Sequence, residues 1–357
     1  MQLLSWTAHQ LGEPLVREER DEKAGPGEVV VRVAGCGVCH TDLGFLYDGV
    51  PTHHPFPLTL GHEVSGIVVE AGTGAESWRG KNVIVPAVIP CGQCEACQTG
   101  HAAACAKQIF LGNDVHGGFA THLRVPANGL CEVPDLANAG TNPGALELFQ
   151  LSVIADAVST PYQAVLRSGL SKGDVAIFVG VGGVGGFGVQ IAAAHGADVI
   201  AIDVNPQRLA LMASHGASLT LRTDETSFKD LRNAVRRFAK ERGVPSWRQK
   251  IFETSGTPGG QATAFGLLGS GGFLSVVGYT PKKVELRLSN LMALDATAQG
   301  NWGCLPEHYP AVLDLVLSGK VALAPFVERR PLDAVNETLT DLREGKVSGR
   351  VILVPEN

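Results

Sequence analysis

The chain has no apolar run that approaches the roughly 20 residues needed to cross a bilayer. Its first residues lack the basic stretch and the long apolar segment of a secretory signal. It also lacks an excess of basic charge, because 29 Lys and Arg face 35 Asp and Glu, for a net charge of −6. We therefore expect a cytoplasmic protein with neither a membrane span nor a nucleic-acid partner.

Internal repeats and low-complexity segments are also missing from the sequence. The hydrophobic content of 45% and the charged content of 18% are typical of a folded globular protein rather than a disordered one. A length of 357 residues is enough for two domains, each with its own core. Glycine is abundant instead, with 44 residues, which favours tight turns and close approaches of backbone segments.

Four of the eight cysteines form a compact run with the spacing C-x2-C-x2-C-x7-C. Four thiolates from one loop can complete a tetrahedral zinc site. A set of disulfides is the ordinary alternative, but the short gaps and the missing secretory signal favour metal. An iron–sulfur cluster uses overlapping spacings, yet Ala106 stands where its bacterial motif usually has proline. The sequence thus predicts a structural zinc held by Cys91, Cys94, Cys97 and Cys105.

The pattern of apolar residues along the chain changes near residue 153. Before it, short apolar runs at 29–33, 64–69 and 83–85 are interrupted by glycine, a pattern that predicts a compact, partly barrel-like β domain. From 153 to about 300, strand and helix patterns alternate, which predicts a doubly wound parallel sheet. The last segment contains a helical pattern at 309–318 and a final strand at 351–354.

A glycine-rich loop follows the strand expected at 175–179 and precedes a helical pattern at 187–195. This context is typical of a dinucleotide site, in which the pyrophosphate lies at a helix N-terminus, although an ordinary strand–helix turn is the alternative. Asp203 ends the next strand and suits the ribose hydroxyls of NAD better than the 2′-phosphate of NADP. Arg208, one helical turn on, can also reach an adenosine ribose or phosphate. The predicted loop residues are Gly180, Gly182, Gly183, Val184 and Gly185.

A second group of metal-binding residue types lies in the first 65 positions. Cys36 and Cys39 stand close together, and His62 and Glu63 follow farther on. Each residue has an ordinary interpretation when taken alone, since a cysteine is often a small core residue and a histidine often a satisfied core side chain. Their combination with the cysteine run and the glycine loop favours a second metal site.

Taken together, these motifs resemble the zinc-dependent medium-chain alcohol dehydrogenase family over essentially the whole chain. The resemblance implies an α/β protein with a GroES-like β-rich catalytic domain at 1–152 and 301–357 and a Rossmann NAD-binding domain at 153–300. It rests on 37–42 (Gly-Val-Cys-His-Thr-Asp), 61–63 (Gly-His-Glu), the cysteine run, 117–120 (Gly-Gly-Phe-Ala), the glycine loop and 348–351 (Ser-Gly-Arg-Val).

The resemblance implies that Cys39 and His62 bind a catalytic zinc. Many family members add a further cysteine where this chain has Asp156, and a bacterial subgroup has aspartate there. Asp156 is therefore the expected third ligand, since carboxylate oxygen binds zinc well; a helix N-cap is the alternative. Glu63 is expected to approach the metal during ligand exchange, and Asp42 to hold the ring of His62.

The resemblance also implies roles in hydride transfer. An alcohol at an open zinc position becomes more acidic, as bound water does, so it can lose its proton before hydride passes to NAD. Thr41 is expected to take that proton, although a local cap is the alternative. The family's relay histidine is replaced by Gly44, so ribose hydroxyls and water, or else His53 or His54, would carry the proton on. Thr160 is expected behind the nicotinamide and Arg350 at the pyrophosphate.

The substrate is less strongly indicated. Ala87 stands where many relatives carry a large aromatic residue, which favours a cyclic or bulky secondary alcohol. Residues 85–91, 112–120 and 302–309 add a more particular likeness, which implies oxidation of a ring alcohol, free or as a coenzyme A thioester. Lys107 is a candidate phosphate contact or a solvated surface charge. Other bulky alcohols or diketones are the alternative substrates.

Two other classes compete with this interpretation. A zinc-free quinone or enoyl reductase would not need Cys39, His62 and the complete cysteine run, and a non-enzymatic binding protein would not need Thr41. The expected assembly is a homo-oligomer, either a dimer or a tetramer, with two zinc ions per chain and NAD.

Overall fold

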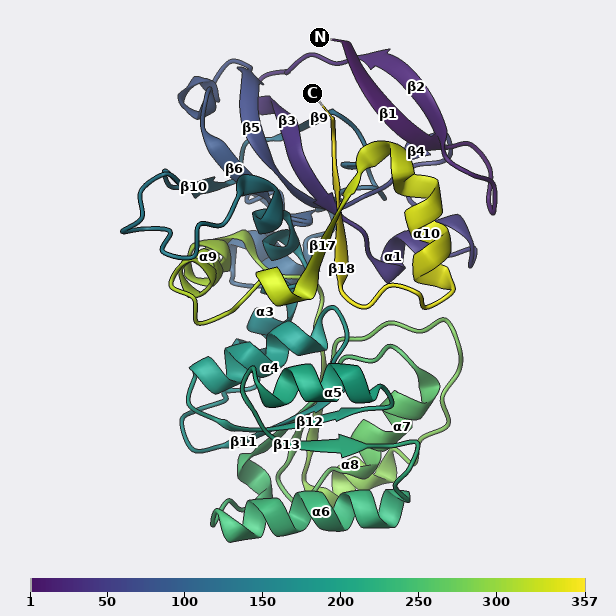
Figure 1. Cartoon of the computed structure of the whole chain (residues 1–357), viewed down its shortest axis with the longest axis vertical. Coiled ribbons are helices and arrows are strands. Elements are labelled where there is room, and N and C mark those ends of the chain that lie inside the picture. Colours follow the sequence, from purple (N-terminus) through teal and green to yellow (C-terminus); the bar gives the residue numbers. More distant parts are fainter. Residues whose placement is uncertain (1, 357) are drawn as a thin grey trace. The chain divides into compact units, whose positions relative to one another are not determined.

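The computed structural model describes residues 2–356, which form two compact units (Figure 1). The first comprises residues 2–159, Gly303–Gly319 and 323–356, and the second comprises Thr160–Trp302 with Lys320–Ala322. Residues 153–159 belong to the first unit because the 3₁₀ segment η3 (Leu148–Ala155) packs on its sheet. Asp156 therefore lies in the same unit as Cys39 and His62.

Three neighbouring strands organise the first unit. β3 (Glu28–Gly37) pairs antiparallel with both β5 (Glu63–Ala71) and β18 (Arg350–Val354). Since antiparallel neighbours run in opposite directions, the end of β3 lies beside the beginnings of β5 and β18. The register places Gly37 opposite Glu63 on one side and opposite Ile352 on the other. Segments from the start, the middle and the end of the chain thus meet at one sheet end.

The β-branched residues of these strands explain both the sheet and its core. Val29, Val31 and Val33 point to the buried side of β3, and valine suits a pleated, packed surface. Val64 of β5 and Phe119 pack in the same cluster. The remaining helices and strands of this unit are β1 (Gln2–Ala8), β2 (Val16–Asp21), α1 (His40–Leu46), β4 (Leu58–Thr59), β6 (Asn82–Val85), β7 (Val88–Ile89), α2 (Glu95–Gln98), β8 (Ile109–Phe110), β9 (His122–Pro126), β10 (Cys131–Val133), α9 (Tyr309–Leu317), β17 (Val327–Pro331) and α10 (Val335–Arg343).

The second unit is a six-stranded parallel sheet in the order β13-β12-β11-β14-β15-β16. Every residue of the central strand β11 (Val175–Val179) is buried, as expected where helices cover both faces. In Figure 1, α4 (Gly185–Ala194) and α5 (Pro206–Ala213) cover one face, and α6 (Phe228–Glu241) lies on the other. The doubly wound sheet predicted from the alternating patterns is confirmed.

The strand order reverses direction at β11, because β12 lies on one side of it and β14 on the other. In such sheets, ligands bind at the carboxyl ends of the strands at this point, where the glycine loop begins. Among residues 2–356, no helix is both long and apolar enough to cross a membrane. The other elements are α3 (Ser159–Arg167), β12 (Asp198–Asp203), β13 (Ala217–Arg222), β14 (Gln249–Glu253), α7 (Pro258–Gly266), β15 (Phe273–Val276), α8 (Ser289–Leu294) and β16 (Thr297–Gly300).

Candidate metal centres and dinucleotide site

The four-cysteine run folds into a lobe whose sulfur atoms converge. Sγ of Cys97 lies 3.9 Å from Sγ of Cys91 and 3.5 Å from Sγ of Cys94, and Sγ of Cys94 lies 3.7 Å from Sγ of Cys105. A disulfide needs about 2.05 Å between sulfurs, so these thiols are not bonded to one another. A tetrahedron of thiolates about 2.3 Å from zinc has edges of about 3.8 Å. The lobe therefore has the dimensions of a four-thiolate zinc site, not of a disulfide set.

Backbone groups prepare this lobe for metal. Hydrogen bonds from the N–H groups of Gln93 and Cys94 lower the pKa of the Cys91 thiol to about 6. The N–H of Cys91 in turn points to Sγ of Cys105 at 3.4 Å. Thiolate is the form that binds metal, so the backbone favours the ligand form of Cys91. At Cys97, by contrast, burial and the hydrogen bond with Cys94 raise the thiol pKa to about 12, so a metal must displace that proton. With four ligands present, such a site has no position for a substrate.

A second centre lies at the sheet end described above. The ligand atoms of Cys39, His62, Glu63 and Asp156 all lie within 4.8 Å of one another. Cys39 follows the end of β3, His62 directly precedes β5, Glu63 is the first residue of β5, and Asp156 follows η3. The first three side chains are buried and Asp156 is partly exposed. The structure thus brings together all four residues predicted for the catalytic zinc.

The buried polar atoms of this centre are unsatisfied. Neither ring nitrogen of His62 and neither carboxylate oxygen of Glu63 has a hydrogen-bond partner. Leaving such atoms buried and unpaired costs on the order of 1–3 kcal/mol each. A divalent cation would satisfy them, and a thiolate, an imidazole and carboxylates form a donor set that suits zinc. The residues present therefore fit the metal that the motifs predict.

Asp42 ties two ligand segments together. Its Oδ2 accepts the N–H of Cys39 at 2.8 Å, and its Oδ1 accepts the N–H of Gly61 at 3.1 Å. Oδ1 also lies 3.5 Å from Nδ1 of His62, on the opposite side of the ring from the Asp156 carboxylate. Asp42 is thus placed where a carboxylate that does not itself bind the metal can orient a histidine ligand.

Glu63 points into the centre because Gly37 leaves it room. A Cβ on Gly37, the residue paired with Glu63 across the strands, would overlap the Glu63 carboxylate. Nη2 of Arg350 lies 3.6 Å from Oε1 of Glu63, and Nη1 donates to the carbonyl of Val38 at 3.0 Å. Arg350, predicted at a pyrophosphate, is here a buried neighbour of the metal ligands in the first unit.

The protonation equilibria of the metal-free centre follow from burial and charge. Burial opposes ionisation of Cys39, but Arg350 and His62 outweigh it and lower the thiol pKa to about 7. Burial raises the pKa of Glu63 to about 8, although Arg350 acts in the other direction. Burial also opposes protonation of His62, yet the neighbouring Asp42 and Asp156 raise its pKa well above the usual value. The centre therefore holds protons near neutral pH that a metal must displace.

Asp156 occupies the position after η3, with φ −144° and ψ −58°. Its Oδ2 lies 3.7 Å from Nε2 of His62. The alternative function as a helix N-cap does not match this place, since α3 begins only at Ser159.

The environment of Cys39 also contains Thr41. Oγ1 of Thr41 lies 3.7 Å from Sγ of Cys39. His53 and His54, the other candidate proton carriers, are held in a neighbouring loop. The His53 ring, 79% exposed, lies 2.6 Å from Oδ1 of Asp114, and the His54 ring contacts His116.

The glycine loop of the second unit has the predicted form. The N–H of Val181 donates to Oδ2 of Asp203 at 2.8 Å, so the carboxylate lies directly beside the loop. A Cβ on Gly185, the first residue of α4, would overlap the carbonyl of Gly180. Arg208 lies over the loop, with Nη1 3.7 Å from the place of a Cβ on Gly182. Gly183 is exposed and Val184 is the N-cap residue of α4, which has the positive end that a phosphate needs.

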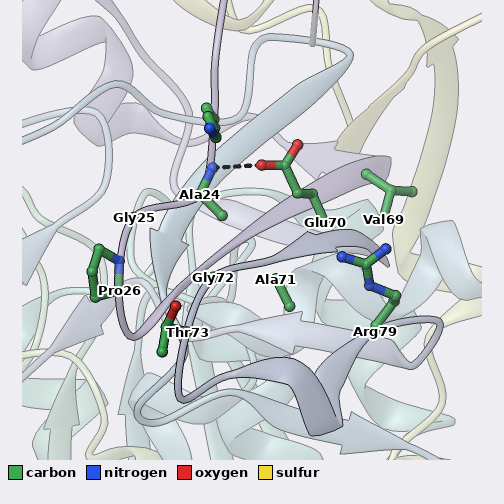
Figure 2. Close-up of a pocket in the computed structure, with 10 residues that line it drawn as sticks. Ala24, Gly25, Pro26, Val69, Glu70, Ala71, Gly72, Thr73 and Arg79 are labelled. Atoms are coloured by element: carbon green, nitrogen blue, oxygen red, sulfur yellow. Dashed lines mark hydrogen bonds between the residues drawn. The ribbon is translucent and has the colours of Figure 1, made fainter.

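The remaining predicted residues lie outside both metal centres. Thr160 is buried in the first turn of α3, where its carbonyl accepts Nδ2 of Asn301 at 3.1 Å. Lys107 is exposed on the segment after the cysteine lobe. A separate pocket of about 630 Å³ in the first unit, shown in Figure 2, contains none of the predicted residues. There the Glu70 carboxylate accepts the N–H of Ala24 at 3.0 Å.

Sequence reasoning missed two contacts of the metal centre. The Phe110 ring packs edge-on against the His62 ring, with centroids 5.3 Å apart. The second contact is the ion pair of Arg350 with Glu63, which the predicted contact of Arg350 with the pyrophosphate did not include. The partners in each contact are far apart in the sequence, and no motif reports such a contact.

We expect zinc binding at the second centre to weaken as the pH falls. Cys39, with a pKa of about 7, and His62, with a raised pKa, must both lose protons to bind metal. The affinity should therefore fall at least about tenfold from pH 7 to pH 6. Competition with a chelator, on protein that keeps the lobe zinc, measures this. An affinity independent of pH over that interval would contradict the assigned ligands.

Comparison with known families agrees with this geometry. The model of the alcohol dehydrogenase GroES-like domain matches residues 25–135, and that of the zinc-binding dehydrogenase matches residues 183–318. The chain is 30% identical to an alcohol dehydrogenase of Geobacillus stearothermophilus, over 95% of this chain and 94% of that one. It is 31% identical to the NAD-dependent alcohol dehydrogenase of Sulfolobus acidocaldarius, over 97% of each.

A solved structure supports the same assignment. The alcohol dehydrogenase of the hyperthermophilic archaeon Aeropyrum pernix has a TM-score of 0.86 and 29% identity, covering 99% of this chain and all of that one. The predicted fold class, a GroES-like domain with a parallel-sheet domain, and the predicted enzyme class are confirmed. With matching motifs, metal centres and relatives, the chain belongs to the zinc-dependent medium-chain alcohol dehydrogenase family.

Proposed function

We propose that this protein catalyses the reversible, NAD-linked oxidation of a cyclic secondary alcohol to a ketone. The observation that carries the proposal is the cluster of Cys39, His62, Glu63 and Asp156, in which the buried polar atoms of His62 and Glu63 have no hydrogen-bond partner. Zinc bound there would act as a Lewis acid that makes an alcohol hydroxyl more acidic, while NAD would accept the hydride.

The side chains of the centre have different proposed roles in binding and exchanging the metal. Cys39, His62 and Asp156 are the proposed resident ligands, which leaves one tetrahedral position for a substrate. Glu63 is the proposed reserve ligand for exchange. Its link to Arg350 supports this, because a carboxylate paired with a buried cation can be held away from the metal at rest.

The preference for NAD over NADP is also part of the proposal. The Asp203 carboxylate lies against the N–H of Val181, where it can accept ribose hydroxyls and would repel a 2′-phosphate. Arg208, which lies over the same loop, could instead bind the 2′-phosphate of NADP. A single guanidinium there equally suits the pyrophosphate that both cofactors share. Thr160 and Arg350 remain proposed cofactor contacts.

Thr41 is the proposed first acceptor of the alcohol proton. Its hydroxyl lies beside the Sγ of Cys39, close to the metal position. His53 is a weaker candidate for the later steps, since its ring already has Asp114 as a partner and is mostly exposed. Water and the ribose hydroxyls are therefore the proposed carriers beyond Thr41, in place of the histidine missing at Gly44.

Replacing Thr41 with Ala should lower kcat by on the order of 10² or more, because the alcohol proton loses its first acceptor. Thr41→Ser, which keeps the hydroxyl, is the matched control and should retain most of the activity. Steady-state rates with zinc content measured in parallel provide the test. A nearly unchanged rate in Thr41→Ala would remove this role.

Ala87 is proposed as one wall of the substrate space. Its carbonyl accepts the N–H of Leu111 at 3.2 Å, and the adjacent Phe110 packs on the ring of His62. A small residue at this place leaves room for a ring. The stretches 85–91, 112–120 and 302–309 also resemble 6-hydroxycyclohex-1-ene-1-carbonyl-CoA dehydrogenase, which supports a coenzyme A thioester of a ring alcohol as the substrate.

Enlarging Ala87 should discriminate among alcohols by size. In Ala87→Trp we expect kcat/KM for cyclohexanol-type alcohols to fall by about tenfold or more relative to small alcohols, since an overfilled site excludes the larger group. Ala87 is buried, so Ala87→Leu provides a milder variant whose thermal unfolding can be compared with the wild type. If bulky and small alcohols were still used equally well, the proposed wall would be wrong.

The overall activity can be tested by following NADH formation with cyclohexanol-type alcohols, both free and as coenzyme A thioesters. A preference for the thioesters is the expected result. Preference for free bulky alcohols or diketones would instead support the broader alternative of a general secondary alcohol dehydrogenase. No turnover with any alcohol, from protein that holds two zinc ions per chain, would contradict the proposal.

A cytoplasmic homo-oligomer, dimer or tetramer, completes the proposal. Thiolate-rich metal sites suit a reducing compartment. The edge strand β16 exposes Thr297, Ala298 and Gly300, and the nearby Leu288 and Met292 are 68% and 78% exposed. Exposed apolar side chains beside an open sheet edge support association with another copy.

A further inference from the structure

We infer that Tyr309 is a positioning residue that holds Asp156 toward the metal and links it to the Ala87 segment. The inference rests on the proposed function, in which Asp156 is a zinc ligand. Tyr309 is the first residue of α9 and is fully buried in the first unit. It touches neither the metal nor the substrate, so its effect would pass through the backbone it holds.

The hydroxyl group of Tyr309 uses both of its hydrogen-bonding capacities. It donates to the carbonyl of Ala155 at 2.5 Å and accepts the N–H of Ala87 at 3.3 Å. A buried tyrosine hydroxyl needs such partners, and here two are backbone groups, with the Ser159 side chain as a further hydrogen-bond partner. Three segments that are remote in the sequence are joined at this one oxygen atom.

The carbonyl of Ala155 is held from several sides. Besides Tyr309, Oγ of Ser159 donates to it at 3.3 Å, and the N–H of Ala87 approaches it at 3.4 Å. This carbonyl belongs to the peptide plane that leads into Asp156. Fixing the plane fixes the direction of the N–Cα bond of Asp156, which is the bond from which the residue and its side chain extend.

Asp156 needs such support because no regular element continues through it. Its φ of −144° and ψ of −58° belong neither to a helix nor to a strand, so no repeating helical or sheet hydrogen-bond pattern defines its direction. Oδ2 lies 3.7 Å from Nε2 of His62. The peptide plane before Asp156, held by Tyr309, Ser159 and Ala87, supports this position.

The second hydrogen bond of the Tyr309 hydroxyl connects it to Ala87, the proposed wall of the substrate space. Ala87, whose N–H donates to Tyr309, accepts the N–H of Leu111 with its carbonyl, and Phe110 packs on the ring of His62. The hydroxyl of Tyr309 therefore lies between a metal ligand and the proposed substrate wall. If Tyr309 only filled space in the core, its aromatic ring would suffice, and phenylalanine could replace it. The hydrogen bonds of the hydroxyl are what phenylalanine cannot make.

The test compares zinc retention in the full enzyme and in Tyr309→Phe, which keeps the ring and removes the hydroxyl. Zinc release to a chelator is followed separately for the two sites, with the lobe zinc as the internal reference. We expect release from the second centre to become about tenfold faster, within the range seen when outer partners of ligands are lost. Release from the lobe should not change.

A spectroscopic readout separates positioning from packing. Cobalt(II) placed in the second centre should show a shifted absorption spectrum in Tyr309→Phe, because the carboxylate ligand moves. Ser159→Ala, which removes one of the other donors to Ala155, should give a smaller change of the same kind. Tyr47→Phe, which keeps the half-buried ring near α1, is the matched control and should leave zinc release and spectrum unchanged.

The outcomes distinguish this inference from the proposed function. Wild-type protein that retains only one zinc per chain would overturn the proposed function, and the inference with it. Two zinc ions with unchanged release and spectrum in Tyr309→Phe would overturn the inference alone, even if the thermal stability fell. Should Tyr309→Phe not fold, an unchanged spectrum and unchanged zinc release in Ser159→Ala would overturn it equally.

Discussion

The antiparallel pairing of β3 with β5 and β18 is the constraint on which the metal centre depends. Its register sets Gly37 opposite Glu63 and brings the start of β18 to the same sheet end. Cys39 and Arg350 arrive there as a consequence of strand direction. A shift of one residue would turn Glu63 to the other face of its strand. The chemistry thus depends first on a hydrogen-bonded ladder and only then on side chains.

The charges gathered at this sheet end must also balance. Asp42, Glu63 and Asp156 bring carboxylates, and Arg350 is the buried cation that faces Glu63. Buried charges are tolerated when they are paired or bind a metal. The ion pairs of His62 and Glu63 leave their buried nitrogen and oxygen atoms without hydrogen bonds, so protein groups alone do not satisfy these atoms. A bound metal would therefore satisfy the buried charged and polar groups of the first unit that its own side chains leave without hydrogen bonds.

Local sequence patterns predicted the helices and strands well, but they did not predict contacts between residues that are far apart in the sequence. The apolar run of β11, the glycine loop and Asp203 follow from neighbouring residues, so the parallel sheet was predictable. The cysteine lobe was predictable because all of its ligands lie in one loop. The proposed third ligand, Asp156, was predicted from resemblance alone, since only the tertiary structure brings it close to Cys39. The contact of Arg350 with Glu63 joins distant strands, and no spacing rule encodes it.

The two metal sites differ in how much of the chain each requires. The lobe closes one short loop, residues 91–105, and the entropic cost of closing a short loop is small. The second centre needs segments near residues 39, 62 and 156, together with β18 close to the end of the chain. During synthesis, the lobe can therefore acquire its zinc while the chain is still on the ribosome. The second centre is complete only after β18 has paired with β3, so of the two metal sites it is the one that needs the tertiary fold.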